Sequence, residues 1–302
     1  MAAGVLAYLA VSVDLDAVLD AFSRVSIWQF VAFTILYQAA LLTTDSFALW
    51  VSLRDTAPGL AIDFPHVVLV RGATYLLAAI SYSVGQGGIV YFLRSAYKVP
   101  FAASAGAVLL TSIGFVLVIA GVIAGGLATH SIPDIPGLFG IAIGVVAIIP
   151  LYLLTIALRP RVFARWPALA PVLRARPRHI LRAVGSRALH TVALLGGHYV
   201  AMHIFGIDVP IGAALARLPV LIVVNALPVS PAGLGTTQAA AVVLFSAFAP
   251  GDTPGAREAT VLAYSLSFHV LSQGFGALLS LPCLRGLPHG LKATEPPAPP
   301  PD

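Results

Sequence analysis

Long apolar runs are the feature that most restricts what this chain can fold into. Several approach or exceed the ~20 residues that a helix needs to cross ~30 Å of hydrocarbon, as at 101–128 (FAASAGAVLLTSIGFVLVIAGVIAGGLA). Hydrophobic residues make up 59% of the 302 residues and charged residues only 10%, which is far from the composition of a soluble domain. The alternating segments of about ten residues that membrane strands show are missing. We therefore predict an all-α, polytopic integral membrane bundle.

Hydropathy predicts apolar spans at 1–13, 27–53, 66–84, 100–128, 137–158, 183–205, 211–229, 236–249 and 257–282. Because some of them are short, we expect about eight transmembrane helices, with short or re-entrant segments at two Gly/Pro breaks. Residues 1–285 would form a single transmembrane domain, whose halves, 1–158 and 183–285, are joined by a loop at 159–182. The proline-rich end, residues 286–302, is expected to be disordered.

The distribution of charge predicts the orientation in the membrane. The 159–182 loop contains seven arginines and no acid, whereas 129–136 contains Asp134 and neither Lys nor Arg. By the positive-inside rule, the arginine-rich loop and the C-terminus face the cytoplasm, and the chain is a multi-pass protein of the cytoplasmic (inner) membrane. The net charge of +5 then reflects the basic residues that set the orientation of the protein in the membrane. No basic stretch interleaved with aromatic residues predicts nucleic-acid binding.

Two apolar segments are interrupted by glycine, GQGG at 85–88 and SPAGLGTTQ at 230–238. Paired breaks in two halves point to a transporter's binding site and are consistent with an internal two-fold repeat. The half-helix that follows each break would present unpaired N–H groups and a positive dipole end to an anion such as phosphate. A turn with a helix cap, supplied by Thr236 or Thr237, is the alternative. The residues predicted to bind a substrate are Gly85, Gln86, Gly87, Gly88, Arg94, Ser230, Gly233, Gly235, Thr236, Thr237 and Gln238.

The two interrupted segments also carry a resemblance. GQGGIVYFLRSAYKVPFAASAGAVLL at 85–110 and LPVSPAGLGTTQAAAVVLF at 227–245 resemble the flippase-like family that includes the transmembrane region of lysylphosphatidylglycerol synthases. The resemblance covers residues 12–282 and implies movement of lipids or lipid-linked precursors between leaflets. In the synthases a separate soluble domain attaches the amino acid to the lipid, and this sequence lacks it, so the resemblance implies translocation without synthesis. Where the family has an acid, an arginine and a glutamate, this chain has Gly88, Tyr91 and Gln238.

Ionisable side chains inside spans are costly, so each is a functional hypothesis. Asp45 and Arg71 lie at similar depth in neighbouring spans and are predicted to form an ion pair, either a structural staple or an external gate. Arg217 is predicted to join them or to meet a lipid phosphate. Arg187 lies near the cytoplasmic end of its span and is predicted to snorkel.

Three histidines lie within spans. His190 and His198 are eight residues apart, on roughly one helical face, and His269 lies deep in the last span. Hydrogen bonds between helices are the simpler interpretation, and a proton relay is the alternative. A metal would need a third ligand and nearby carboxylates, so we expect neither a metal nor a cofactor.

Three functions fit these observations. The first is translocation of a phospholipid or a polyprenyl-linked precursor by a protein that is not an enzyme. The second is an accessory subunit that assists an envelope-biogenesis partner protein in a lipid or polysaccharide pathway. The third, an intramembrane enzyme that acts on lipid-linked substrates, is disfavoured because Asp45 is the only clearly intramembrane carboxylate.

Overall fold

The computed structural model describes residues 22–23, 25–59, 62–128, 169–173, 175–226 and 234–288, together with 140, 143, 144, 146, 147, 150 and 151. Every element within the described part is helical, which confirms the predicted all-α class. The elements are α3 (Ile27–Thr56), α4 (Phe64–Ala73), α5 (Tyr75–Ile80), α6 (Tyr82–Tyr97), α7 (Phe101–Ala128), α9 (Ala170–Leu173), α10 (Pro177–Ile204), α11 (Ile211–Ala226), α12 (Thr236–Phe245), η3 (Ser246–Phe248) and α13 (Pro254–Gly286). The predicted span at 1–13 and residues 289–302 of the tail lie outside the described residues.

The helices fall into two length classes. Among the described residues, α3, α13 and the Phe101–Gly126 part of α7 are long and apolar enough to cross a membrane. Shorter apolar helices cover Phe64–Ile80, Ile211–Ala226 and Thr236–Phe248. The short helices flank the two regions where the sequence predicted interruptions: Phe64–Ile80 precedes the first, Ile211–Ala226 precedes the second, and Thr236–Phe248 begins within the second. Long spans and broken segments therefore coexist in one bundle.

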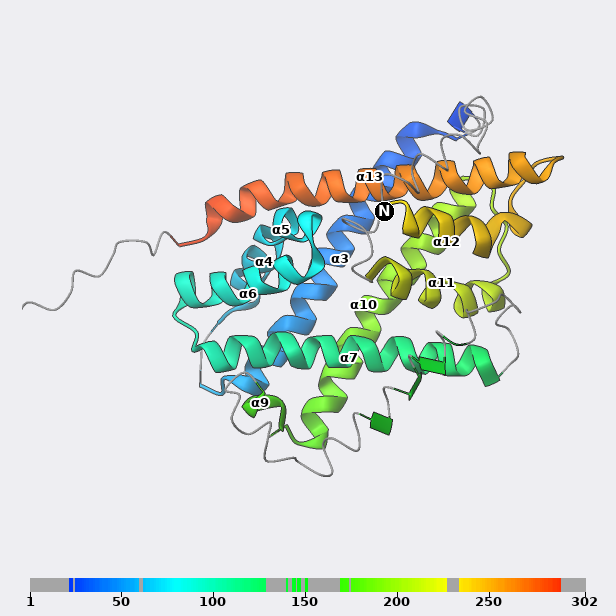
Figure 1. Ribbon diagram of the computed structural model, residues 1–302. Helices are drawn as coiled ribbons and strands as arrows, with labels where there is room; N and C mark the ends of the chain where they lie inside the picture. The colour runs from blue at the N-terminus through cyan, green and yellow to red at the C-terminus, as the bar shows by residue number, and fades with distance from the viewer. Residues whose placement is uncertain are drawn as a thin grey trace, which may run out of the picture.

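The long helices form a frame that holds the short ones (Figure 1). α7 and α13 run along opposite edges of the molecule, and α3 and α10 cross between them. α4, α5 and α6 fill one side of this frame, and α11 and α12 fill the other. The contacts match between the two sides: α4 packs on α13 as α11 packs on α7, and α6 packs on α7 as α12 packs on α13.

A ring cluster fills the contact between α3, α10 and α13. The ring of Tyr37 lies 5.0 Å from that of Phe268, and the ring of Phe30 lies 5.1 Å from that of Phe205. Aromatic pairs at these separations stabilise a core beyond the area they bury.

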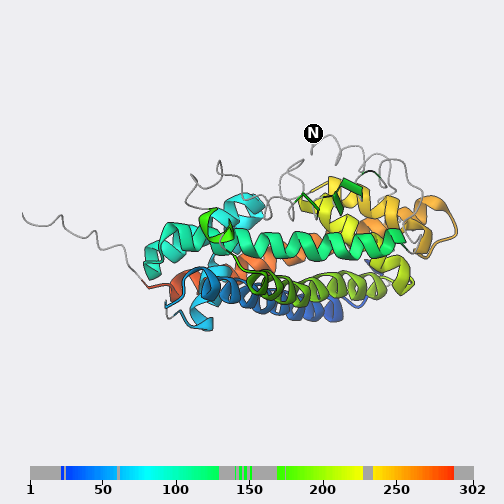
Figure 2. The same ribbon diagram turned by 90° about the horizontal axis from the view of Figure 1, so that it is seen from below.

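Figure 2 shows α3 (blue) and α10 (yellow-green) along one side of the molecule, with α12 (yellow) on the other.

Glycines allow α10 to approach its neighbours closely. A Cβ atom on Gly114 of α7 would lie 2.8 Å from the backbone oxygen of Ala183 in α10. A Cβ atom on Gly197 of α10 would overlap the ring of Tyr37 in α3. These two contacts set how near α10 lies to α7 and α3.

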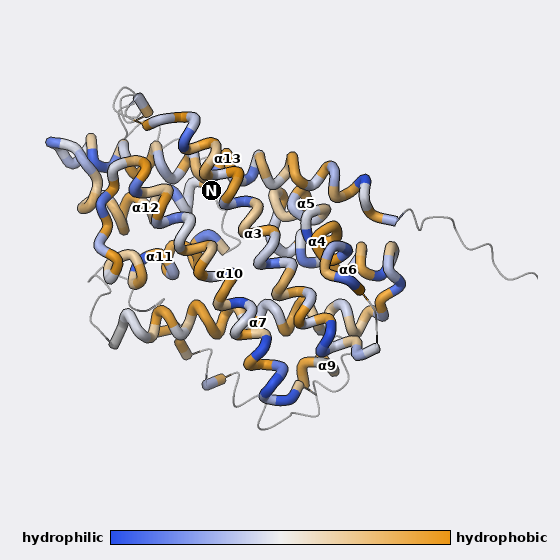
Figure 3. Tube along the Cα trace, turned by 180° about the vertical axis from the view of Figure 1, so that it is seen from behind, coloured by the Kyte–Doolittle hydropathy of each residue, from blue (hydrophilic) through white to orange (hydrophobic). Residues whose placement is uncertain are grey.

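Hydrophilic residues gather where α10 begins, next to α9 (Figure 3). α10 starts at Pro177, six residues before the predicted span, so the end of the predicted 159–182 loop is helical. Pro177 is at the first helical position, which proline favours because its missing N–H would have no partner there. In this region Arg182 donates to Asp55 Oδ1 at 3.0 Å, linking the start of α10 to the end of α3.

We expect Gly197→Ala to lower the thermal unfolding temperature of the purified protein, because the added methyl group must displace the packed ring of Tyr37. Overpacking of this kind costs about 1–3 kcal/mol. Gly196→Ala is the matched control, since Gly196 is exposed and its Cβ would have no atom within 4 Å. Equal melting temperatures for the two variants would contradict the close approach of α3 and α10.

Candidate functional site

The first glycine segment does not break the helix. Gly85, Gln86, Gly87 and Gly88 all lie within α6, so the prediction of an interruption at these residues is wrong. The chain breaks one turn earlier, at Ser81, whose backbone is extended (φ −162°, ψ 139°) between α5 and α6.

The glycines of this segment have a packing role. A Cβ atom on Gly85 would lie 2.8 Å from Ala78 Cβ, and one on Gly88 would lie 2.5 Å from Leu77 Cδ1. α5 and α6 therefore form a tight helix hairpin, with the break at Ser81 as its turn. Gly85 lets the two backbones approach, since a Cβ atom there would also lie 3.0 Å from Ala78 Cα. A sequence does not distinguish such a glycine from one that unwinds a helix.

Arg94 lies on the outer face of α6. Its guanidinium is 5.5 Å from the centre of the Phe101 ring, a cation–π contact that holds the side chain at the surface. With Gly87, Val90, Tyr91 and Ser95 it lines a shallow hollow of about 440 Å³. Of the residues predicted in this segment, Gly87 and Arg94 line the hollow, whereas Gly85 and Gly88 are buried against α5.

The second segment does separate two helices, as predicted. α11 ends at Ala226 and α12 begins at Thr236, and Ser230 and Gly233 lie outside the described residues. Gly235 is the N-cap, with φ 87° and ψ −52°, a conformation that glycine tolerates and other residues rarely adopt. Thr236 and Thr237 lie inside α12, so the prediction that one of them is the N-cap is wrong.

Gln238 fixes the start of α12. Its amide oxygen, Oε1, accepts a hydrogen bond from the backbone N–H of Gly235 at 2.6 Å. The nitrogen of the same amide group is Nε2. The side chain is fully buried, and Nε2 has no hydrogen-bond partner among the described residues. Beside it, the Thr237 hydroxyl donates to Asn225 Oδ1 at 3.0 Å, tying α12 back to the end of α11.

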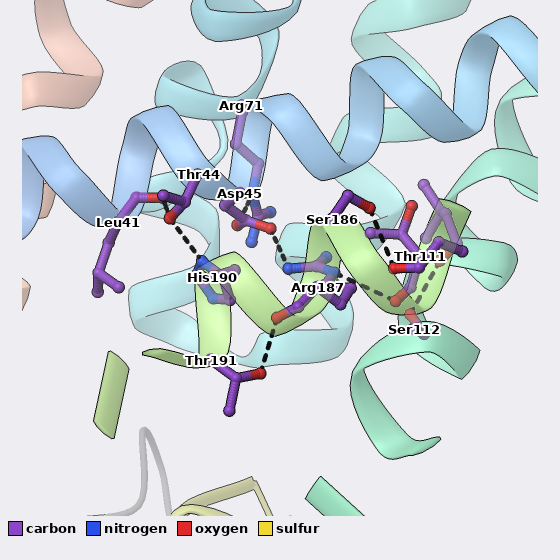
Figure 4. Close-up of polar contacts among 12 residues, drawn as sticks. Leu41, Thr44, Asp45, Arg71, Thr111, Ser112, Ser186, Arg187, His190 and Thr191 are labelled. Carbon is purple, nitrogen blue, oxygen red and sulfur yellow. Dashed lines mark hydrogen bonds and ion pairs between the residues drawn. The ribbon is translucent and has the colours of Figure 1, made fainter. Parts of the chain in front are cut away.

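The predicted pair of Asp45 and Arg71 is present and is part of a larger cluster (Figure 4). Arg71 Nε donates to Asp45 Oδ2, and Arg187 Nη1 donates to Asp45 Oδ1 at 2.5 Å. Arg187 Nε donates to the backbone oxygen of Thr111 at 3.1 Å. The cluster thus joins α3, α4, α7 and α10, and its three charged side chains are each no more than 9% exposed.

Arg187 does not snorkel, so that prediction is wrong. Its side chain is 7% exposed and points into the bundle. The buried position of Arg187 follows from the early start of α10. Because Pro177 is the first residue of the helix, Arg187 lies in the third turn rather than at the helix end.

Arg217 does not join the cluster. Its Nη1 donates to the backbone oxygen of Leu244 at 2.6 Å, and its guanidinium lies 4.6 Å from the centre of the Phe248 ring. The prediction that it meets Asp45 and Arg71 is therefore wrong. Instead it links α11 to the end of α12 and to η3.

The three predicted relay histidines have separate surroundings. His190 Nδ1 lies 3.1 Å from Thr44 Oγ1, beside the charge cluster, whereas His198 Nδ1 lies 2.8 Å from the Tyr264 hydroxyl. His269 Nε2 is buried without a hydrogen-bond partner in the described part of the chain. No hydrogen bond among the described residues joins the three histidines, and the two with partners bond to other helices.

Charge balance predicts different effects for two substitutions in the cluster. Asp45→Asn leaves two buried guanidinium groups without a carboxylate, whereas Arg187→Gln leaves the balanced pair of Asp45 and Arg71. Breaking a buried pair by removing one partner costs about 3–5 kcal/mol. We expect thermal unfolding in detergent to show a much larger loss for Asp45→Asn than for Arg187→Gln. Equal losses would mean that packing, rather than charge balance, governs the stability of the cluster.

The sequence matches the model of a known protein family. This model, described as the lysylphosphatidylglycerol synthase TM region, matches residues 1–280, a range that includes both helix hairpins and the charge cluster. No curated protein matches the sequence. The match to this family confirms the resemblance that the two glycine segments indicate. The chain, a membrane protein with several apolar helices, belongs to the lysylphosphatidylglycerol synthase TM-region family.

Proposed function

We propose that the protein is a translocase that moves a lipid or a lipid-linked precursor across the cytoplasmic membrane without changing it chemically. The observation that carries this proposal is the pair of helix hairpins, α5–α6 and α11–α12, which both pack on α7 and α13. The apolar helices that contain α5 and α12 cover Phe64–Ile80 and Thr236–Phe248, each shorter than the ~20 residues that cross ~30 Å of hydrocarbon. Helix ends at membrane depth persist only where they line protein or a water-filled cavity. The hairpins are therefore the places where a polar headgroup can be received.

The two hairpins belong to two halves that we interpret as an internal repeat, α3–α7 and α10–α13. The matched contacts support this interpretation: among these eight helices, exchanging α3 with α10, α4 with α11, α6 with α12 and α7 with α13 reproduces the same set of neighbours, while α5 has no counterpart. Many transporters are built from such repeats, and one half rocks against the other around a fixed site. This motion would expose the headgroup site first to one leaflet and then to the other, while the acyl chains stay in the bilayer.

The second hairpin supplies donors for a headgroup. The first turn of α12 carries backbone N–H groups at the positive end of the helix dipole. Beside it, the buried Nε2 of Gln238 has no partner among the described residues. A buried donor without a partner costs about 1–3 kcal/mol, which an oxygen of a bound headgroup would recover. Because the Gln238 amide is neutral, its Nε2 can donate to an oxygen of a charged or of an uncharged headgroup.

The first hairpin and the arginine-rich loop complete the proposal. Arg94 on the outer face of α6 carries a positive charge that attracts anionic headgroups towards the hollow it lines. The loop at 159–182 and the C-terminus would face the cytoplasm, which the positive-inside rule supports. The partners of the protein are then the membrane lipids themselves, phospholipid or polyprenyl-linked.

The test is translocation of fluorescent phospholipid by purified protein in vesicles, with Gly235→Ala as the variant. Alanine at φ 87° would distort the start of α12 and the contact between Gly235 and Gln238. We expect the rate to fall at least about tenfold, which corresponds to about 1.4 kcal/mol. Gly206→Ala is the matched control, because Gly206 also has a positive φ (70°) but lies in the loop after α10, with only Pro250 Cγ at 3.6 Å from its Cβ.

Two outcomes would contradict the proposal in different ways. If folded Gly235→Ala protein transports at the rate of the wild type, α12 does not form the site. If the wild type moves no lipid, and instead copurifies with an envelope protein in fixed ratio, the protein is an accessory subunit.

A further inference from the structure

The buried charge cluster has more positive than negative charge. Arg71 and Arg187 share the single carboxylate of Asp45, so the cluster has a formal charge of +1. The remaining carboxylates within the described ranges lie at or near helix ends or in connecting segments, and they are Asp55, Asp63, Asp208, Asp252 and Glu258. A surplus charge among membrane-spanning helices is costly and marks a pathway or a site. An anion of single negative charge would balance it.

An apolar groove lies between α3, the helix that carries Asp45, and α13. It has a volume of about 260 Å³ and is lined by Ile35, Gln38, Ala39, Phe275, Leu278 and Leu279 of α3 and α13. Five of these side chains are apolar, which suits an acyl chain. The sixth, Gln38, is only 7% exposed, and its Oε1 has no hydrogen-bond partner among the described residues. A buried acceptor in this position requires a donor, such as a headgroup hydroxyl.

Tyr75 lies between Gln38, which lines the groove, and Arg71 of the charge cluster. Gly276 of α13 separates Gln38 and Tyr75, since a Cβ atom there would lie 2.7 Å from Gln38 Nε2 and 3.6 Å from Tyr75 Cδ2. The ring centre of Tyr75 is 5.7 Å from the guanidinium carbon of Arg71. Gln38, Tyr75 and Arg71 are therefore near neighbours, with Gln38 at the groove and Arg71 in the cluster.

We propose that the translocated substrate is an anionic, phosphate-bearing lipid, with an acyl chain in the groove between α3 and α13 and its negative charge drawn to Arg71 and Arg187. This inference rests on the proposed function and adds the substrate class. Arg71 and Arg187 are 7% and 6% exposed, so the headgroup reaches them when the two halves move apart. Because both arginines contact Asp45, the carboxylate balances one of their two charges and the lipid neutralises the other.

The test compares two fluorescent probes in vesicles, phosphatidylglycerol with one negative charge and phosphatidylcholine with none. We expect the wild type to move phosphatidylglycerol at least about fivefold faster, a ratio that corresponds to about 1 kcal/mol. Arg187→Gln should bring the ratio close to one while phosphatidylcholine still moves. Arg182→Gln is the matched control: it removes the same charge from the same helix, but Arg182 is 61% exposed and pairs with Asp55. This control should keep the preference of the wild type.

A second pair of variants tests the groove without touching the charges. Ala39→Trp places an indole in the groove from its exposed side, whereas Ala40→Trp changes a neighbouring exposed residue that does not line the groove. We expect Ala39→Trp to slow the movement of both probes at least about fivefold, by the same conversion of about 1 kcal/mol. Ala40→Trp should leave both rates near those of the wild type. Equal rates for the two tryptophan variants would remove the groove from the proposal.

The outcomes separate this inference from the proposed function. If the wild type moves both probes equally, the protein is a translocase but does not select anions. If it moves neither, native mass spectrometry of protein in mixed micelles of the two lipids still tests the site. Preferential retention of phosphatidylglycerol by the wild type and by Arg182→Gln, but not by Arg187→Gln, would support an anion site. Equal retention by all three would overturn it.

Discussion

The contact of Asp45 with Arg71 and Arg187 is the interaction on which the arrangement of the long helices depends. It joins α3, α4 and α10, and through the backbone of Thr111 it also reaches α7. In a low-dielectric interior, charges without partners are far more costly than hydrogen-bonded ones, so these helices have little freedom to slide past one another. The apolar side chains between them resemble the lipid tails outside, so a polar contact contributes more to their register than burial does.

Around this contact, glycine is used in two different ways. Gly85 and Gly88 let α5 and α6 pack closely, whereas Gly235, with φ 87°, lets the chain turn into α12. Both uses give short helices, α5 with 6 residues and α12 with 10. The first hairpin is tight and has its turn at Ser81, while the second leaves a buried amide nitrogen of Gln238 without a partner in the described part. The two hairpins are thus alike in position and different in chemistry.

The sequence predicted the features that depend on length, depth or a strong backbone preference. The run at 27–53 became α3 (Ile27–Thr56), and the similar depth of Asp45 and Arg71 predicted their pair. The break before α12 was also predictable, since prolines and glycines occur together there. Hydropathy failed where the answer depends on a neighbouring helix. The glycines of α6 are explained by α5, and Arg187 was misplaced because the polar first turns of α10 carry no hydropathy signal. Arg217 has the same residue type as Arg71, but its partners are a backbone oxygen and a ring.

The cluster can be both a staple and a binding site because its three charges have unequal roles. A carboxylate with one guanidinium would be neutral and would favour one closed arrangement of the helices. The second guanidinium makes the closed arrangement less stable than a neutral one, since one positive charge is buried without a matching negative charge. An anionic headgroup that enters between the halves neutralises this charge, so its binding favours the state that contains it. Differential affinity of this kind is what a ligand needs to shift a conformational equilibrium. A translocase built on this principle would move an anionic lipid faster than a zwitterionic one, because only the anion removes the surplus charge of the cluster.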